Sequence, residues 1–215
     1  MTMYEINHHL TDELLMSYSA GTLPEAFSIA VAAHLSMCDE CRAQAATFDA
    51  IGGAILEEGR AEMSADALAK ALGRIRGSKP EARRAPPVKS DLPAPVRDYV
   101  GGDLASIRWK PVGGGVKQAL LHDDGVATAR LLCIPGGASV PDHGHAGTEL
   151  TLVLKGAFAD EYDRFGPGDI EVADEDVDHQ PVAEPGADCI CLAATDARLR
   201  FHGWIPRLAG RIMRI

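Results

Sequence analysis

The feature that most constrains this chain is a run of metal-ligand side chains near its amino terminus. His34, Cys38 and Cys41 follow the spacing H-x3-C-x2-C, between two segments with helical periodicity. Zinc prefers thiolate and imidazole ligands in a tetrahedron, and this run supplies three of them. If residues 24–38 are helical, His34 and Cys38 lie one turn apart, and Cys41 falls in the first turn of the next helix. The spacing therefore predicts a zinc site, and two buried cysteines beside a surface histidine are the alternative.

A fourth ligand is available just before the first predicted helix. Thr11 can cap that helix, Gly21 ends it, and His8 and His9 directly precede it. We expect His9 to bind the metal because it lies closer to the start of the helix, although spacing separates it only weakly from His8. Such a set closes a structural tetrahedron and should contribute much of the stability of these short helices. The other helices are predicted over residues 24–38, 39–58 and 64–76.

The composition changes sharply between residues 77 and 97. Prolines and basic residues occur here with few large apolar side chains. Proline-rich segments adopt extended conformations and act as semi-rigid spacers. We therefore expect a helical zinc domain over residues 1–76 and a second domain over residues 98–215. The linker should hold the two domains apart and leave them able to reorient.

Short strand signals separated by turn residues follow from about residue 99 onward. No helical periodicity interrupts them, which favours an antiparallel β-barrel of the jelly-roll kind. The chain as a whole is predicted to be an α + β protein of two domains, a small helical bundle followed by this barrel. The predicted strands cover residues 106–112, 116–122, 126–134, 149–154, 157–163, 170–172, 180–183, 189–194 and 199–201.

A second set of metal-ligand residues lies within the predicted barrel. His143 and His145 are two positions apart and point the same way from an extended chain, and Glu149 begins the next strand. His179, on a separate strand, completes a set that suits zinc, iron, manganese or nickel. The spacing G-x5-H-x-H-x3-E-x6-G resembles the first motif of the cupins. Pro-Gly-Asp followed by His179 resembles the second, although His179 lies farther from Gly168 than is usual there.

Charge and cysteine content limit the partners and the compartment. The formal net charge is −10, and residues 1–70 hold 11 acidic and 3 basic side chains. Such a surface repels nucleic acid and suits a basic protein partner, which argues against a DNA-binding finger. Five cysteines, mostly in metal-like spacing, favour a reducing compartment. With no signal peptide and no apolar run of membrane-spanning length visible, we expect a cytoplasmic protein without membrane contact.

The order of the H-x3-C-x2-C helices, the proline-rich segment and the cupin motif resembles the ChrR-type zinc anti-sigma factors over essentially the whole chain. This resemblance implies that residues 1–76 hold an extracytoplasmic-function sigma factor away from RNA polymerase. It implies that the barrel triggers release when singlet oxygen or related oxidants appear, and that the chain is a regulator and not an enzyme. The implied metal ligands are His9, His34, Cys38 and Cys41 for a structural zinc, and His143, His145, Glu149 and His179 for a second divalent metal, expected to be zinc.

Two questions stay open from the sequence. A metal-dependent cupin enzyme, such as a dioxygenase or isomerase with the zinc helices as an assembly module, is the alternative function, because a cupin ligand set serves catalysis and sensing alike. For the anti-sigma factor, a small molecule or an oxidant at the cupin is the expected signal. Cys189 and Cys191 lie on one face of a predicted strand, either as small buried hydrophobes or as a redox-sensitive pair. Cys133 is expected in the core.

Overall fold

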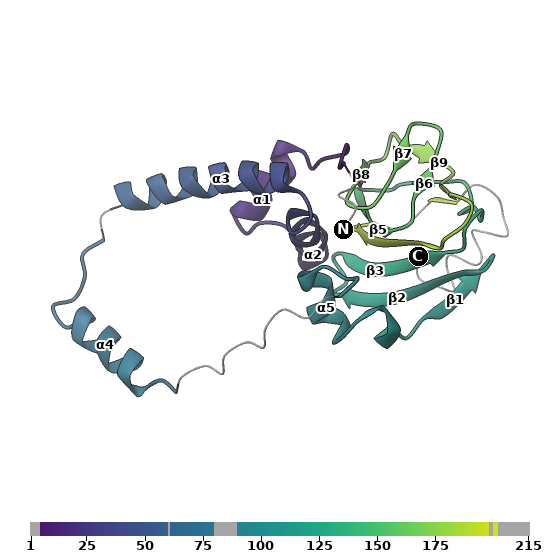
Figure 1. Cartoon of the computed structure of the whole chain (residues 1–215). Helices are drawn as coiled ribbons and strands as arrows, with labels where there is room; N and C mark the ends of the chain where they lie inside the picture. Colours follow the sequence, from purple (N-terminus) through teal and green to yellow (C-terminus); the bar gives the residue numbers. More distant parts are fainter. Residues whose placement is uncertain (1–4, 60, 80–89, 198–199, 202–215) are drawn as a thin grey trace.

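The helices precede the strands along the chain and lie to one side of them (Figure 1). The structure, a computed structural model, describes residues 5–59, 61–79, 90–197 and 200–201. Its helices are α1 (Asp12–Ser19), α2 (Glu25–Leu35), α3 (Asp39–Glu58), α4 (Ala67–Gly77), α5 (Ala94–Val100) and the short 3-10 helix η1 (Leu104–Ser106). Its strands are β1 (Lys110–Gly113), β2 (Val116–Asp123), β3 (Thr128–Ile134), β4 (His143–Gly144), β5 (Glu149–Lys155), β6 (Phe158–Ala159), β7 (Arg164–Phe165), β8 (Ile170–Ala173), β9 (Asp178–His179), β10 (Val182–Ala183), β11 (Cys189–Thr195) and β12 (Arg200–Phe201).

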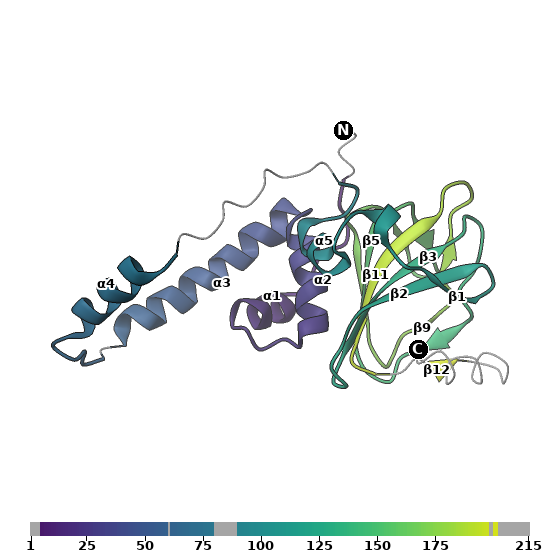
Figure 2. The ribbon, with the colours of Figure 1, turned by 90° about the horizontal axis from the view of Figure 1, so that it is seen from below.

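The strands form an antiparallel barrel. The largest sheet has the order β1-β2-β3-β11-β5-β8, and two three-stranded sheets, β10-β6-β7 and β12-β4-β9, complete the barrel (Figure 2). Because side chains alternate along a strand, the large sheet contributes side chains to two hydrophobic cores, one between the sheet and the helices and one inside the barrel. In β5, Leu150 and Leu152 pack toward the helices, whereas Val153 packs inside the barrel against Phe158 and Phe165.

α2 is the central helix of the fold because it has hardly any polar face. A helix that is apolar all round has to be buried on all sides. It packs on strands β2, β3, β5 and β11, and α1, α3 and α5 contact its other sides. Its buried residues are Ala26, Phe27, Ile29, Ala30, Val31, Ala33 and His34.

α2 ends earlier than the sequence predicts. Its last residue is Leu35, and the backbone N–H of Cys38 donates to the carbonyl of His34 at 2.8 Å as the chain leaves the helix. Cys38 itself is extended and caps α3, with its sulfur 3.4 Å from the backbone nitrogen of Cys41. The expectation that His34 and Cys38 share one helix is therefore wrong. The two cysteines instead flank the first turn of α3, where the helix dipole favours thiolates.

The strand expected over residues 157–163 is interrupted. Only Phe158–Ala159 and, after a turn, Arg164–Phe165 pair with neighbouring strands. In the turn, the carboxylate of Asp160 accepts the backbone N–H groups of Tyr162 and Asp163 at 2.9 and 3.0 Å. Aspartate competes for backbone donors in this way and ends the strand.

The helices are not held apart from the barrel. One continuous hydrophobic cluster includes side chains of α1, α2 and α5 together with the outer face of the large sheet. The carboxyl-terminal part of the predicted linker belongs to α5, whose Val96 is fully buried. The expectation of separated domains is wrong for these helices, because the apolar surface of α2 favours burial against the sheet. Pro80, Pro86 and Pro87 and the end of the predicted second domain lie outside the described residues, so the domain bounds stay a prediction.

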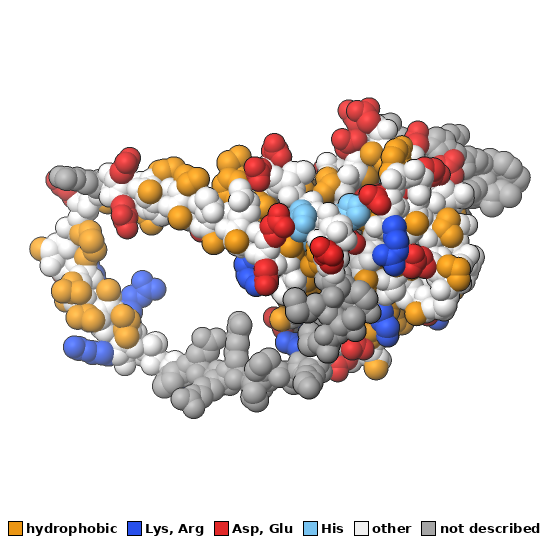
Figure 3. Space-filling view, turned by 45° about the horizontal axis from the view of Figure 1, so that its top comes forward, with side chains coloured by type: hydrophobic (Ala, Val, Ile, Leu, Met, Phe, Trp, Pro, Cys, Tyr) orange, Lys and Arg blue, Asp and Glu red, His pale blue; other side chains and the backbone are white. Residues whose placement is uncertain are grey.

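α3 and α4 extend away from this body as an arm (Figures 1 and 2). Only Cys41 and Ala45 of α3 are buried, and α4 has no buried residue. Large apolar side chains are therefore exposed along both helices (Figure 3). We call this segment, residues 46–77, the α3–α4 arm. Its exposed apolar residues are Ile51, Ile55, Leu56, Met63, Leu68, Leu72 and Ile75.

Candidate metal centres

The first predicted ligand set converges where α1, α2 and α3 meet. One ligand atom each from His9, His34, Cys38 and Cys41 can be chosen so that all four lie within 4.8 Å of one another. Nδ1 of His9 is 3.4 Å from the sulfur of Cys38 and 3.6 Å from that of Cys41. A sulfur and a nitrogen bound to one tetrahedral zinc at ordinary bond lengths are about 3.5 Å apart. Both distances from His9 therefore fit ligands that share one zinc ion.

The outer contacts of the two imidazoles fix which nitrogen can serve as a ligand. Nδ1 of His34 donates to the backbone carbonyl of Gly168 at 2.9 Å, and its buried Nε2 has no hydrogen-bond partner among the described residues. Burial lowers the pKa of His34 to about 4, so the ring is neutral near pH 7 and Nε2 carries a lone pair. Nε2 of His9 lies 3.5 Å from the carboxylate of Glu40, which leaves Nδ1 facing the sulfurs. Outer partners of this kind orient metal-binding histidines.

Both cysteines of this set are buried, and binding of a cation would change their protonation. Cys38 and Cys41 are each 3% exposed, and burial raises the pKa of Cys41 to about 11. Without a cation, this thiol stays protonated at neutral pH. Zinc binding deprotonates thiols, and the freed thiolate is then stabilised by the metal.

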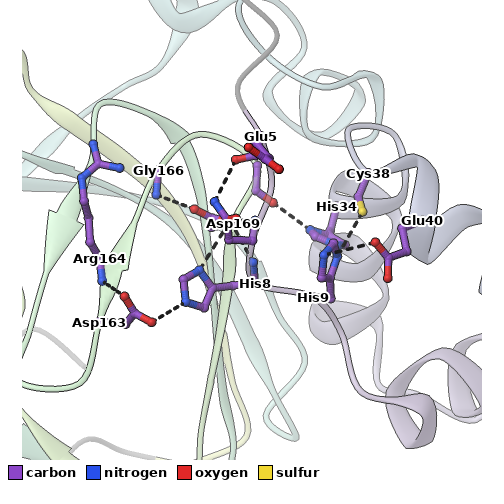
Figure 4. Close-up of polar contacts among 12 residues, drawn as sticks. Glu5, His8, His9, His34, Cys38, Glu40, Asp163, Arg164, Gly166 and Asp169 are labelled. Atoms are coloured by element: carbon purple, nitrogen blue, oxygen red, sulfur yellow. Dashed lines mark hydrogen bonds and ion pairs between the residues drawn. The ribbon is translucent and has the colours of Figure 1, made fainter.

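His8, which spacing alone does not separate from His9, lies on the other side of the backbone. Its Nε2 is 3.1 Å from the carboxylate of Asp163, and its Nδ1 is 3.5 Å from that of Asp169 (Figure 4). Both carboxylates belong to the barrel. His8 therefore ties the amino-terminal segment to the barrel, and His9 faces the cysteines.

Three of the four residues of the second predicted set also converge. His143, His145 and His179 are buried, and their ligand atoms lie within 4.8 Å of one another. His143 and His179 are directly opposite on the paired strands β4 and β9. Nε2 of His145 is 3.3 Å from Nε2 of His179, close to the separation of about 3.3 Å for two nitrogens on one tetrahedral zinc. Nδ1 of His143 contacts the carbonyl of Pro141 at 2.8 Å, so Nε2 is the ligand atom that this ring offers.

Glu149 stands beside this group and not within it. One of its carboxylate oxygens is 3.7 Å from Nδ1 of His145, and the other accepts the hydroxyl of Thr151 at 2.9 Å. At this distance Glu149 neighbours the ring of His145, whose buried Nδ1 makes no hydrogen bond to any described residue. Its predicted role as a direct ligand stays a prediction, because nothing in the described geometry brings it to the three Nε2 atoms.

Two carboxylates that the sequence analysis missed hold His179. Nδ1 of His179 is 2.9 Å from Asp160 and 3.0 Å from Glu171. Burial alone disfavours the imidazolium, but the contacts with Glu171 and then Asp160 outweigh it and raise the pKa of His179 to about 9. The alternation of β8 did not identify Glu171, because a glutamate between Ile170 and Val172 is expected on the exposed face of a strand, whereas Glu171 is buried.

The remaining cysteines are buried free thiols. The sulfurs of Cys189 and Cys191 are 3.5 Å apart inside the barrel, on one face of β11 as expected. The interaction with Cys189 and burial both raise the pKa of Cys191 well above its ordinary value. A thiol held in its protonated form is a poor nucleophile, so the geometry favours the hydrophobic interpretation of this pair. Cys133 is likewise buried, as predicted.

The chain is similar to known proteins over most of its length. Residues 98–198 match the family described as the ChrR Cupin-like domain. The anti-sigma-E factor ChrR of Cereibacter sphaeroides is 55% identical over 213 residues, which cover 98% of this chain and 99% of that protein.

The chain belongs to the ChrR family of anti-sigma factors.

A solved structure confirms the fold of this ChrR-family chain. The structure of Rhodobacter sphaeroides SigE in complex with the anti-sigma ChrR matches with 56% identity and a TM-score of 0.79, covering 89% of this chain and 100% of that one. The predicted fold class, helices followed by a cupin barrel, is confirmed. The family also supports the prediction of a regulator in place of an enzyme. No helix in the described part of this ChrR-family chain has the length and apolar character of a membrane span.

Proposed function

We propose that this chain is a cytoplasmic anti-sigma factor that sequesters an extracytoplasmic-function sigma factor. The observation that carries the proposal is the similarity over nearly the full length to a ChrR chain that was solved in complex with SigE. On this proposal the sigma factor is held away from RNA polymerase because chain and polymerase compete for it. Release follows when the barrel responds to an oxidant, such as singlet oxygen.

The α3–α4 arm supplies a surface of the kind that a protein partner covers. Leu68, Leu72 and Ile75 are exposed on one helix, and Ile55 and Leu56 are exposed on the other. Side chains of this type, gathered on two helices, favour association with another protein. The net charge of −8 over residues 1–70 favours a partner with a basic surface.

The zinc site of the helices determines where the arm points. His9 precedes α1, His34 lies in the last turn of α2, and Cys38 and Cys41 lie at the start of α3. A zinc held by these four side chains ties the three helices together, and the arm continues directly from the third. We propose that this zinc is structural and that a sigma factor binds only when α3 is held in place.

The barrel site is proposed to hold a second zinc, with His143, His145 and His179 as ligands and Glu149 beside them. Bound metal provides a Lewis-acidic centre there, and the imidazoles are oxidisable side chains. His179 is kept in position by Asp160 and Glu171. Damage to one of these rings would change the strands that carry it, which gives the barrel a way to report an oxidant.

Co-purification with the cognate sigma factor tests the proposal. The wild-type chain should form a stable complex, and the double variant Cys38→Ala, Cys41→Ala should lose it together with its zinc. Cys133→Ala is the matched control, because it removes a buried thiol outside both sites. Exposure to a photosensitiser in light should dissociate the wild-type complex, whereas the photosensitiser in the dark should leave it bound. Absence of a complex, or a complex indifferent to the cysteine substitutions, would contradict the proposal.

A further inference from the structure

A stretch of five residues in the barrel contacts both metal centres. The carbonyl of Gly168 accepts the Nδ1 proton of His34, and the carboxylate of Glu171 is 3.0 Å from Nδ1 of His179. The two contacts leave the chain in opposite directions, because Gly168 lies in the turn beside the helices and Glu171 points into the barrel. We call residues 167–171 the connecting segment.

The connecting segment also anchors the backbone that carries His9. The carboxylate of Asp169 accepts the N–H groups of Asn7 and His8 at 2.7 and 3.0 Å, and the N–H of Ile170 donates to the carbonyl of His8 at 3.3 Å. Asp169 is only 3% exposed, so these charge-assisted contacts are shielded from water. Two of the four ligands of the helical zinc site, His9 and His34, therefore take their position from the connecting segment.

The turn at Gly168 is closely packed against the amino-terminal segment. Gly168 has a φ of +96°, and a Cβ atom on it would lie 2.6 Å from Cδ1 of Ile6 and 3.7 Å from Cε of Met37. Ile6 comes from the segment that leads to His9, and Met37 lies next to Cys38. A displacement of the turn is consequently transmitted to both sides of the helical zinc site, because close-packed groups move together.

We propose that the connecting segment couples the two metal centres, so that occupancy of the barrel site stabilises the zinc site of the helices. When His179 is held through Nε2, its Nδ1 faces the carboxylates of Asp160 and Glu171, and the contact with Glu171, at 3.0 Å, supports β8. When His179 is released, β8 and the preceding turn lose that support, and His34 and His9 lose part of theirs. The proposal rests on the proposed function only for its biological purpose, in which loss of barrel ligation loosens the arm that holds the sigma factor. Coupling of this kind is reciprocal between two binding sites.

Accessibility of the zinc-site thiols in the full chain tests the coupling. The alkylation rates of Cys38 and Cys41 are measured by mass spectrometry in the zinc-loaded wild-type chain and in His143→Ala, which empties the barrel site. We expect alkylation to be at least about fivefold faster in His143→Ala, the lower end of ordinary allosteric coupling. Equal rates in the two proteins would overturn the proposal.

Gly168→Ala then tests the route. In this variant the ratio of the two rates, with and without His143→Ala, should fall to about one, the value for uncoupled sites. The matched control is Gly125→Ala, because Gly125 also has a positive φ, of +80°, but a Cβ atom on it would contact nothing within 4 Å. Asp169→Asn is the second variant if Gly168→Ala does not fold. A ratio that stays at the wild-type value in the variant that folds would refute the connecting segment as the route.

Hydrogen exchange supplies a readout that does not depend on thiols. Amides of residues 5–9 and 168–171 should exchange several times faster in His143→Ala than in the wild-type chain, whereas amides of β3 should be unchanged. A change in exchange rate of the same size in all parts of the chain, or no change at all, would contradict the proposal. Sigma binding is measured separately: coupling without sigma binding would refute the proposed function alone, and sigma binding without coupling would refute the connecting segment alone.

Discussion

The exposed side chains of α4 permit a quantitative test of sigma-factor binding. Leu68 is 70% exposed and Ile75 is 68% exposed, although both are large apolar residues. Complete burial of such a side chain contributes about 1.5–3 kcal/mol. Since about two thirds of each is open in the chain alone, a partner that covers them gains about 1–2 kcal/mol from each.

The double variant Leu68→Ala, Ile75→Ala should therefore weaken the complex by about 2–4 kcal/mol, a factor of about 30 to several hundred in Kd. The dissociation constant is measured by calorimetric titration of the full-length chain with the purified sigma factor. Thermal unfolding should change little, by about 0.5 kcal/mol or less for each substitution, because neither side chain is packed within the chain.

Leu120→Ala is the matched control for this experiment. Leu120 is 59% exposed on β2, in the barrel and away from the arm, and its replacement should leave Kd unchanged. If the double variant bound the sigma factor as tightly as Leu120→Ala does, the arm would not be the docking surface. A loss of binding together with a large loss of thermal stability would also refute the reasoning. Such a loss of stability would mean that both residues are packed in the free chain.

Three further predictions concern stability, metal content and pH. Phe27→Ala should lower the free energy of unfolding by about 3–5 kcal/mol in denaturant titrations, because Phe27 is 3% exposed within the helix–barrel core. Metal analysis should find two zinc ions per wild-type chain and one in His143→Ala; an unchanged content would remove the barrel site from consideration. The backbone N–H groups of Ala127 and Val126 hold the pKa of Asp124 at about 2, below its ordinary value of 3.8. The carboxylate thus stabilises the fold above about pH 4, and this contribution is lost as pH falls toward 2. The free energy of unfolding of Asp124→Asn should therefore fall less between about pH 4 and about pH 2 than that of the wild-type chain. An equal fall in the two proteins would contradict the assignment.

The local features of this chain follow from its sequence because they depend on neighbouring residues. The hydroxyl of Thr11 caps α1 at Leu14 N–H, as the pattern before the helix predicts. Cys189 and Cys191 face the same side because a strand repeats every two residues. The spacings H-x3-C-x2-C and H-x-H likewise place ligands that are close in the chain.

Contacts between distant segments were outside the reach of such patterns. His34 meets Gly168, and His179 meets Asp160, because packing brings the segments together and not because of any spacing. The approach of α2 to the sheet was equally hidden, since the proline-rich composition indicated separation whereas burial of an apolar helix favoured contact.

The amino-acid sequence by itself indicated the first four helices, most of the short strands, the histidines and cysteines that converge, and the family, because periodicity, turn residues and ligand spacing are local properties. The tertiary structure alone decided that His9 and not His8 faces the cysteines, that carboxylates hold His179, and that residues 167–171 contact both centres. These features depend on contacts between segments that lie apart in the chain, by 19 residues for His179 and Asp160 and by 134 for His34 and Gly168. That choice is made by the burial of apolar surface summed over the whole fold.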